Sequence, residues 1–371
     1  MQPLIWLAVP AVLAGIYHLI ACFAACKRLL ARPAQGVAAY PAVSILKPIH
    51  GRDPDFYGAI RSHALLDYPE FEILFGLSDP RDPAREDIER LLREFPGGRI
   101  RLVECSRGMP NGKVAVLAGL AREARHPVLV INDSDIVVEA DYLRQVISLL
   151  AEPKCGLATC LYRARGTSWP ARWEALGIAT DFAPSVLVAR TLGIAEFALG
   201  STIALRAADL ERAGGFAAIG DYLADDYQLG RRISELGYRI SLAYTVVETH
   251  LSGETWGDVW RHQVRWARTI RVSRAGGYFG YVITNASVWA LVAAASGVWR
   301  IALASLAARI LAGVITGWLV LRDRSVPRFW FVMPFRDLWG FAVWLAGAAG
   351  STVDWRGEKL RLARDGRISR L

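Results

Sequence analysis

Long apolar stretches lie near both ends of the chain, and a region of mixed polarity separates them. Residues 4–25 are almost wholly apolar, and about 20 such residues cross the hydrocarbon layer of a bilayer as a helix. Lys27, Arg28 and Arg32 follow this stretch, and no basic segment precedes it. A cleaved signal peptide is the alternative, but the charge pattern favours a retained anchor, residues 1–27, whose C-terminal end faces the cytoplasm.

Short β-rich runs alternate with helical stretches in the central region, residues 40–275. The pattern predicts strands over 43–46, 71–75, 100–103 and 128–131, and helices over 55–66, 84–95, 113–124 and 140–150. Such alternation predicts an α/β domain with a mainly parallel sheet. Its ligand crevice is expected at the carboxyl ends of the strands.

The apolar pattern returns after the central region, over 278–299, 301–321 and, more weakly, 329–352. We expect transmembrane or interfacial helices over 278–353 and a basic tail over 354–371. If all three segments crossed the membrane, the tail would lie outside, against the positive-inside tendency. One segment is therefore expected to be re-entrant or interfacial, and the last one, which contains Pro334, Arg336 and Asp337, is the first candidate.

Composition supports a soluble insert between membrane segments. The hydrophobic fraction of 53% exceeds the usual level of about 45–50%. The net charge of +9 suits anionic lipid or a phosphorylated substrate, and the absence of a zinc-finger or RNP-type motif argues against nucleic acid. The five cysteines lack metal-ligand spacing, which favours a reduced, cytosolic domain over a disulfide framework.

Acidic residues follow two of the predicted strands. Asp79 could accept hydrogen bonds from a base or a ribose, or it could simply form a turn before Pro80. Asp133 and Asp135 come directly after the fourth strand, where a Mg²⁺ or Mn²⁺ ion is commonly held by one or two carboxylates and substrate phosphate oxygens. Asp135 is the candidate metal ligand and Asp133 the candidate ribose or diphosphate partner, although an acidic loop without a ligand would have the same sequence.

Three further positions open predicted helices. Lys113 follows Gly112 where helix N–H groups favour phosphate, and a solvated lysine is the alternative. Asp225 and Asp226 could cap their helix, or one of them could act as a general base toward an acceptor hydroxyl.

His262, Arg265 and Trp266 have helical spacing, and the first two share a face. Arg265 could neutralise a departing diphosphate, and Trp266 could stack on a sugar or line an acceptor channel. Interfacial helices also carry arginine and tryptophan without any chemistry.

Taken together, these residues resemble the D, DxD, D, (Q/R)xxRW pattern of inverting GT-A-type glycosyltransferases. The stretches 43–48, 66–69, 79–84 and 224–227 are more specifically similar to the ceramide glucosyltransferase family, including its bacterial branch associated with hopanoid biosynthesis. The similarity covers nearly the whole chain, from the N-terminal anchor to the basic tail.

The resemblance implies a GT-A-type, Rossmann-like fold and transfer of a sugar from a UDP-sugar, with inversion, to a lipid hydroxyl. The location it implies is the cytosolic face of a bacterial inner membrane. By position, Asp79 and Asp133 would bind UDP, Asp135 would bind Mg²⁺ or Mn²⁺, and Asp226 would be the base. The nucleotide-sugar site would also include Lys113, Asp225, His262, Arg265 and Trp266. His262 stands where the family usually has glutamine or arginine.

The segment 260–268 is similar to the hopanoid branch, which implies transfer of N-acetylglucosamine to bacteriohopanetetrol. Transfer of glucose to ceramide is the alternative. The apolar segment 191–205 could be an acceptor wall or simply buried core. A processive polysaccharide synthase and an inactive scaffold are further alternatives. Three or four spans offer little material for a polymer channel, and retained carboxylates without a ligand would be costly.

Overall fold

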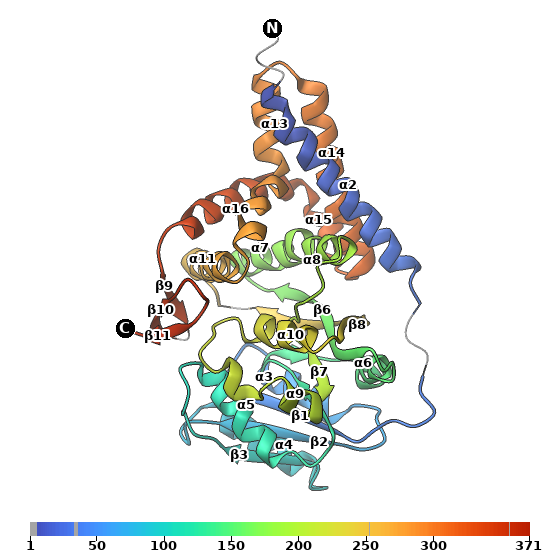
Figure 1. Cartoon of the computed structure of the whole chain (residues 1–371), viewed down its shortest axis with the longest axis vertical. Coiled ribbons are helices and arrows are strands. Elements are labelled where there is room, and N and C mark those ends of the chain that lie inside the picture. The colour runs from blue at the N-terminus through green and yellow to red at the C-terminus, as the bar shows by residue number, and fades with distance from the viewer. Residues whose placement is uncertain (1–5, 33–35, 252, 356) are drawn as a thin grey trace. The chain divides into compact units, whose positions relative to one another are not determined.

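The computed structural model describes residues 6–32, 36–251, 253–355 and 357–371 (Figure 1). The chain forms two compact units. We call residues 32–162, 195–250 and 366–371 the sheet unit, and residues 1–31, 163–194 and 251–365 the helical unit. The predicted central region, residues 40–275, contributes to both units, because 163–194 and 251–275 cluster with the apolar segments.

An eight-stranded sheet, in the order β3-β2-β1-β4-β7-β6-β8-β5, is the centre of the sheet unit. Its strands are β1 (Val43–Ile49), β2 (Phe71–Leu77), β3 (Ile100–Glu104), β4 (Val128–Ile131), β5 (Ile136–Val137), β6 (Cys155–Gly166), β7 (Ile203–Arg206) and β8 (Arg239–Leu251). β1 pairs in parallel with β2 and β4, and β2 with β3. β7 pairs antiparallel with β4 and β6, and β5 with β8. The predicted α/β class is confirmed, and the four predicted strands form the parallel half of the sheet.

Helices cover both faces of this sheet. One face packs against α3 (Phe56–Ala64), α4 (Ala84–Glu94) and α6 (Tyr142–Leu150), and the other against α5 (Gly112–Glu123), α9 (Ala207–Arg212), η3 (Phe216–Ile219) and α10 (Asp225–Glu235). Neighbouring strand residues alternate between the faces, so Ile45 belongs to the first core and Leu46 to the second. In the segment 191–205, Ala198 and Ile203 belong to the second core, which favours the buried-core interpretation over an acceptor wall.

All the remaining helices of the described residues belong to the helical unit. They are η1 (Trp6–Ala8), α2 (Val9–Leu30), α7 (Trp169–Gly177), η2 (Ile178–Phe182), α8 (Ala183–Thr191), α11 (Trp256–Ser273), α12 (Ala275–Gly280), η4 (Tyr281–Thr284), α13 (Ala286–Ala295), α14 (Trp299–Val314), η5 (Ile315–Val320), α15 (Val326–Phe329), η6 (Trp330–Val332) and α16 (Met333–Ala348). The predicted basic tail also contains strands: β9 (Thr352–Trp355) and β10 (Glu358–Leu362) form an antiparallel pair here, and β11 (Ile368–Arg370) belongs to the sheet unit.

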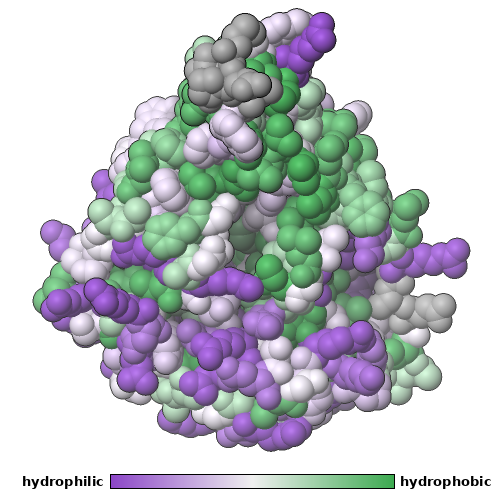
Figure 2. All heavy atoms as spheres, turned by 45° about the horizontal axis from the view of Figure 1, so that its top comes forward, coloured by the Kyte–Doolittle hydropathy of each residue, from purple (hydrophilic) through white to green (hydrophobic). Residues whose placement is uncertain are grey.

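Two helices among the described residues are long and apolar enough to cross a membrane, Trp6–Leu30 and Trp299–Val320. A third candidate exists if Ala275–Thr284 and Ala286–Ala295, bent by 54°, form one span. Small residues let these helices approach closely: the Cβ position at Gly15 lies 3.6 Å from the Ser305 Cα atom. Figure 2 shows apolar residues gathered over the visible surface of these helices, as expected for contact with lipid.

Candidate active site

The loop after β4 is fixed from several sides within the sheet unit. The buried Asn132 side chain donates hydrogen bonds to the Ser201 carbonyl at 2.8 Å and to the Tyr142 hydroxyl at 2.9 Å. Lys47, fully buried on β1, donates from Nζ to the Asp133 carbonyl oxygen at 3.0 Å. These contacts hold the loop that carries the predicted carboxylates, and Lys47 lies inside β1.

Lys113 is the centre of a charged cluster. Its Nζ atom lies 2.7 Å from Asp133 Oδ1 and 3.2 Å from Asp225 Oδ2. The Asn111 side chain caps α5 by accepting the Val114 N–H at 3.1 Å and thereby orients the first turn that carries the lysine. Although burial opposes the charge, the carboxylates of Asp133 and Asp225 raise the pKa of Lys113 above its usual value. The solvated-lysine alternative is therefore wrong.

Asp226 lies beside this cluster. Its Oδ2 atom accepts the Gly200 N–H at 3.0 Å, and its Oδ1 atom accepts the Tyr227 N–H at 2.7 Å. Helix α10 begins at Asp225, and Ala224 occupies its N-cap position, so neither aspartate is the N-cap residue. Burial and the neighbouring Asp225 carboxylate raise the pKa of Asp226 to about 6, against the lowering effect of Lys113. A carboxylate with this pKa can accept a proton near neutral pH.

A glycine allows these groups to converge. The Cβ position at Gly200 lies 3.3 Å from Asp133 Oδ2, 3.4 Å from Asp226 Oδ2 and 3.7 Å from Lys113 Nζ. A Cβ atom here would crowd Asp133 Oδ2 and would be in ordinary contact with the other two groups. The close approach of this backbone is what places the Gly200 N–H against Asp226.

Asp135 lies two residues beyond Asp133, in the turn between β4 and β5. It accepts a hydrogen bond from the Thr249 hydroxyl on β8. Burial, followed by the charge of Asp133, raises the pKa of Asp135. Such a carboxylate gains from a nearby cation, and the described residues include no cluster of three or more histidine, cysteine or acidic side chains that could hold a metal ion by themselves. One protein carboxylate completed by phosphate oxygens is a coordination common for Mg²⁺.

Asp79 follows β2, two strands away from β4 in the sheet. Its Oδ1 atom accepts the Arg81 N–H at 2.9 Å, and this hydrogen bond is the main reason that the pKa of Asp79 lies below its usual value. The turn-forming interpretation therefore describes part of its role. Its side chain is also exposed enough to accept further hydrogen bonds.

The other three predicted residues lie on α11 in the helical unit. A capping box between Thr255 and Asp258 starts this helix. The rings of His262 and Trp266, one helical turn apart, contact each other edge to face, with their centroids 4.6 Å apart. The centroids of the Trp266 and Phe182 rings are 5.9 Å apart.

The sheet unit thus brings together Lys113, Asp133, Asp225 and Asp226, with Asp135 next to them. Sequence reasoning did not find the supporting residues Lys47, Asn132 and Thr249. A lysine inside an apolar strand is the one local signal that could have pointed to them, since an unpaired buried charge is costly.

The fold is that of a GT-A-like glycosyltransferase. The structure resembles a mannosyltransferase from Pyrobaculum calidifontis, solved with GDP-mannose and Mn²⁺, with a TM-score of 0.57 and 20% identity over 93% of this chain and 97% of that one. The chain matches the model of glycosyl transferase family 21 over residues 4–368 and belongs to this family.

Curated relatives are similar over part of their length. Ceramide glucosyltransferase 1 of Caenorhabditis elegans is 27% identical over 208 residues, which are 55% of this chain and 44% of the relative. The ceramide glucosyltransferase of Candida albicans is 31% identical over 124 residues, 30% of this chain and 23% of the relative. The chain thus matches less than half the length of these relatives.

Proposed function

We propose that this family 21 glycosyltransferase moves a sugar from a UDP-sugar to a lipid hydroxyl, with inversion, at the cytosolic face of a bacterial inner membrane. The observation that carries the proposal is the convergence of Asp226, Lys113 and Asp133 at the carboxyl end of β4, in a chain that also has apolar helices long enough to span a bilayer. Ligand crevices of α/β sheets lie at this edge.

In the reaction, Asp226 accepts the proton of the acceptor hydroxyl. The hydroxyl oxygen then forms a bond to the anomeric carbon as the bond from that carbon to the UDP oxygen breaks, and UDP leaves with the electron pair. Two backbone N–H groups hold the Asp226 carboxylate in place. Its pKa of about 6 leaves it ionised at neutral pH and still basic enough to take a proton.

Asp79 and Asp133 contact the UDP moiety in this proposal, and Lys113 neutralises negative charge close to the diphosphate, with Asp225 fixing the lysine. Asp135 would hold Mg²⁺ or Mn²⁺, which supplies positive charge to the diphosphate when bound. The similar mannosyltransferase was solved in complex with Mn²⁺, which supports a divalent ion. On α11, Arg265 and His262 would contact the leaving diphosphate and Trp266 the sugar or the acceptor.

Two donor and acceptor pairs are compatible with these residues. The segment 260–268 supports transfer of N-acetylglucosamine to a hopanoid polyol such as bacteriohopanetetrol, which is our first candidate. The names of the curated relatives support transfer of glucose from UDP-glucose to ceramide as the second. A single acetamido group distinguishes the donors, and the same carboxylates would serve both.

The test is sugar transfer by the detergent-purified protein with Mg²⁺ or Mn²⁺, offered each UDP-sugar with each lipid, and with products identified by mass spectrometry. A hexosamine on the hopanoid supports the first candidate. A hexose on ceramide would replace the first candidate with the second, transfer of glucose to ceramide. If no pair gives a lipid product, the proposed function is contradicted and the inactive scaffold becomes the better interpretation. A polysaccharide product would indicate a processive synthase.

A further inference from the structure

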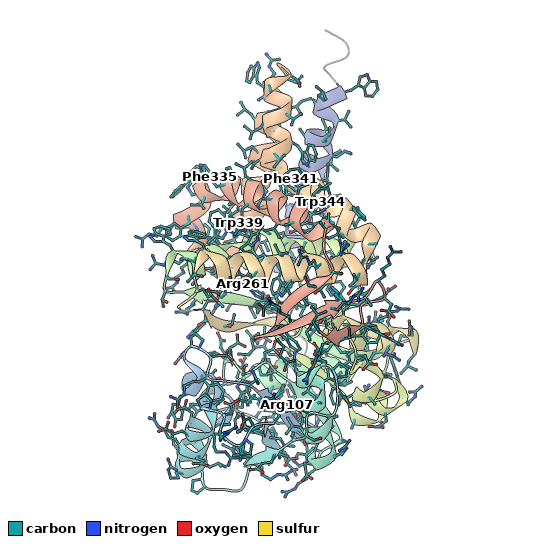
Figure 3. The ribbon with its side chains drawn as sticks, turned by 90° about the vertical axis from the view of Figure 1, so that its left-hand side faces the viewer. Arg107, Arg261, Phe335, Trp339, Phe341 and Trp344 are labelled. Carbon is teal, nitrogen blue, oxygen red and sulfur yellow. The ribbon has the colours of Figure 1, made fainter. Side chains whose placement is uncertain are left out.

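The loop before α10, residues 220–223, is hydrogen-bonded to the start of α5 within the sheet unit. The connection between β3 and α5, which carries Arg107 (Figure 3), ends at Asn111. The Asn111 N–H donates to the Gly220 carbonyl oxygen at 2.9 Å, and the Asn111 side chain donates from Nδ2 to the Tyr222 carbonyl oxygen at 2.8 Å. Asn111 is fully buried. One residue therefore both caps α5 and holds the loop that leads into α10.

A second segment pairs with the same loop. We call residues 366–368 the tail segment, and they belong to the sheet unit together with the loop. The Ile368 N–H donates to the Asp221 carbonyl oxygen at 2.7 Å. Tyr222 and Arg367 form an antiparallel β-bridge beside this hydrogen bond. The tail segment therefore binds the loop as a short added strand.

The tail segment begins with a glycine in a left-handed conformation. Gly366 has a φ of 87°, where other residues are strained. Its carbonyl oxygen accepts the Leu223 N–H at 3.5 Å. This hydrogen bond is long, so the one donated by Ile368 is the main backbone contact between the tail segment and the loop.

The first turn of α10 depends on this loop because it has no side-chain cap. Ala224 occupies the N-cap position and makes no capping hydrogen bond. The first N–H groups of a helix have no partners inside the helix, and helix ends fray. Asp225 and Asp226 both lie in this first turn, and Asp225 contacts Lys113. The positions of the two carboxylates therefore depend on how firmly the loop is held.

We propose that Asn111 and the tail segment are positioning elements that clamp the loop 220–223 and thereby fix Asp226 for proton transfer. Both act through the loop and not on the substrate. Asn111 fixes the loop to the helix that carries Lys113, and the tail segment adds the backbone hydrogen bonds that the loop lacks on its own. The inference rests on the proposed function, because it takes Asp226 as the general base, and a base acts only within hydrogen-bond reach of its proton.

The first test is Ile368→Pro, which removes the N–H that the Asp221 carbonyl oxygen accepts. We expect kcat to fall by about tenfold or more, since a displacement of about 1 Å can cost about a hundredfold. The affinity for UDP with Mn²⁺, measured by calorimetry, should stay within about twofold of wild type, because Lys113 keeps its contact with Asp133. Ile368→Val is the matched control: valine is close to proline in size and retains the N–H, so kcat should also stay within about twofold.

Asn111→Ser tests the other half of the clamp. Serine is an equally good N-cap residue, so α5 remains capped, but its side chain is too short to reach the Tyr222 carbonyl oxygen. We expect kcat to fall by about tenfold here too. A purely structural role would give a lower unfolding temperature or fewer UDP sites per protein, with kcat per UDP site unchanged.

Hydrogen exchange, measured by mass spectrometry, tests the clamp without an assay of activity. Ile368→Pro should raise the exchange rate of the segment 221–228 by about tenfold or more, whereas Ile368→Val should not, and β1 should be unchanged in both variants. Unchanged exchange in the segment 221–228 would overturn the inference. So would a wild-type kcat per UDP site in both Ile368→Pro and Asn111→Ser. The proposed function fails separately, when the wild-type protein makes no glycolipid from any pair, and hydrogen exchange then decides the inference alone.

Discussion

Lys113→Met should move the pH dependence of sugar transfer to higher pH. Burial and the Asp225 carboxylate raise the pKa of Asp226 to about 6, a value that already includes the lowering effect of Lys113. Removing the cation leaves these two effects unopposed. Since the base must be deprotonated to accept the acceptor proton, the acidic limb of kcat/KM against pH follows the pKa of Asp226 in the free enzyme.

The geometry gives the size of the shift. Lys113 Nζ and Asp226 Oδ2 both lie within 4 Å of the Cβ position at Gly200, so they are at most about 8 Å apart. Two unit charges at about 8 Å and an effective dielectric constant of about 20 interact by roughly 2 kcal/mol, or about 1.5 pH units. The cluster is partly open to solvent, which reduces this value, and we expect a shift of about one unit.

The assay is kcat/KM for transfer to lipid between pH 5 and 8, at saturating Mn²⁺, with Lys154→Met as the control. Lys154 lies in an exposed turn after α6, and its removal should leave the profile unchanged. The maximal rate of Lys113→Met should also fall, since the lysine is proposed to act on the diphosphate. An acidic limb that stays in place, or that moves to lower pH, would refute the electrostatic coupling between Lys113 and Asp226.

Three further variants test separate parts of the molecule. Asp226→Asn should lower kcat by about a hundredfold or more, the usual contribution of a general base, with UDP affinity nearly unchanged by calorimetry; turnover near that of wild type would remove the base assignment. Asp135→Ala should weaken UDP binding in Mn²⁺ by about tenfold or more and leave UDP binding in EDTA unchanged. If the variant and the wild type show the same Mn²⁺ dependence, Asp135 is not the metal ligand. Arg309→Met leaves Asp181 and Asp337 without their shared partner, so it should destabilise the protein by about 3–5 kcal/mol and lower the unfolding temperature in detergent. Arg300→Met, on the exposed start of the same helix, is the control and should change the unfolding temperature little.

Local patterns predicted the parallel half of the sheet because β1, β2 and β4 are short, buried runs rich in apolar residues. Val128–Ile131 has the predicted bounds, and Val43–Ile49 continues three residues further, through Lys47 and Pro48. A lysine normally ends such a run. Here its amine is satisfied by the Asp133 carbonyl, a contact 86 residues away in the chain that no local pattern contains.

The candidate site was predictable as a set of residue types and not as a set of contacts. Asp133 and Asp226 stood out because one follows a predicted strand and the other opens a predicted helix. The contacts that join Lys113 to Asp133 and to Asp225 connect three distant segments of the chain, and no local pattern contains them. The tail segment gave no signal at all. It lies within the predicted basic tail, and only its pairing with the loop before α10 joins it to the candidate site.

The two charge clusters differ in net charge, and this difference distinguishes a structural network from a candidate catalytic site. In the helical unit, Arg309 and Arg336 meet Asp181 and Asp337, two positive charges against two negative, and Ser287 donates two further hydrogen bonds to Asp337. Such a closed network needs nothing from outside and fixes helices to one another.

In the sheet unit, Lys113 is surrounded by the carboxylates of Asp133, Asp225 and Asp226, with Asp135 close by. The second lysine, Lys47, compensates little, because burial lowers its pKa to about 7. This cluster carries excess negative charge. Burial, followed by the charge of the neighbouring carboxylates, raises the pKa of both Asp135 and Asp226. In the proposed function, a divalent cation beside Asp135 and a proton taken up by Asp226 would both relieve that excess.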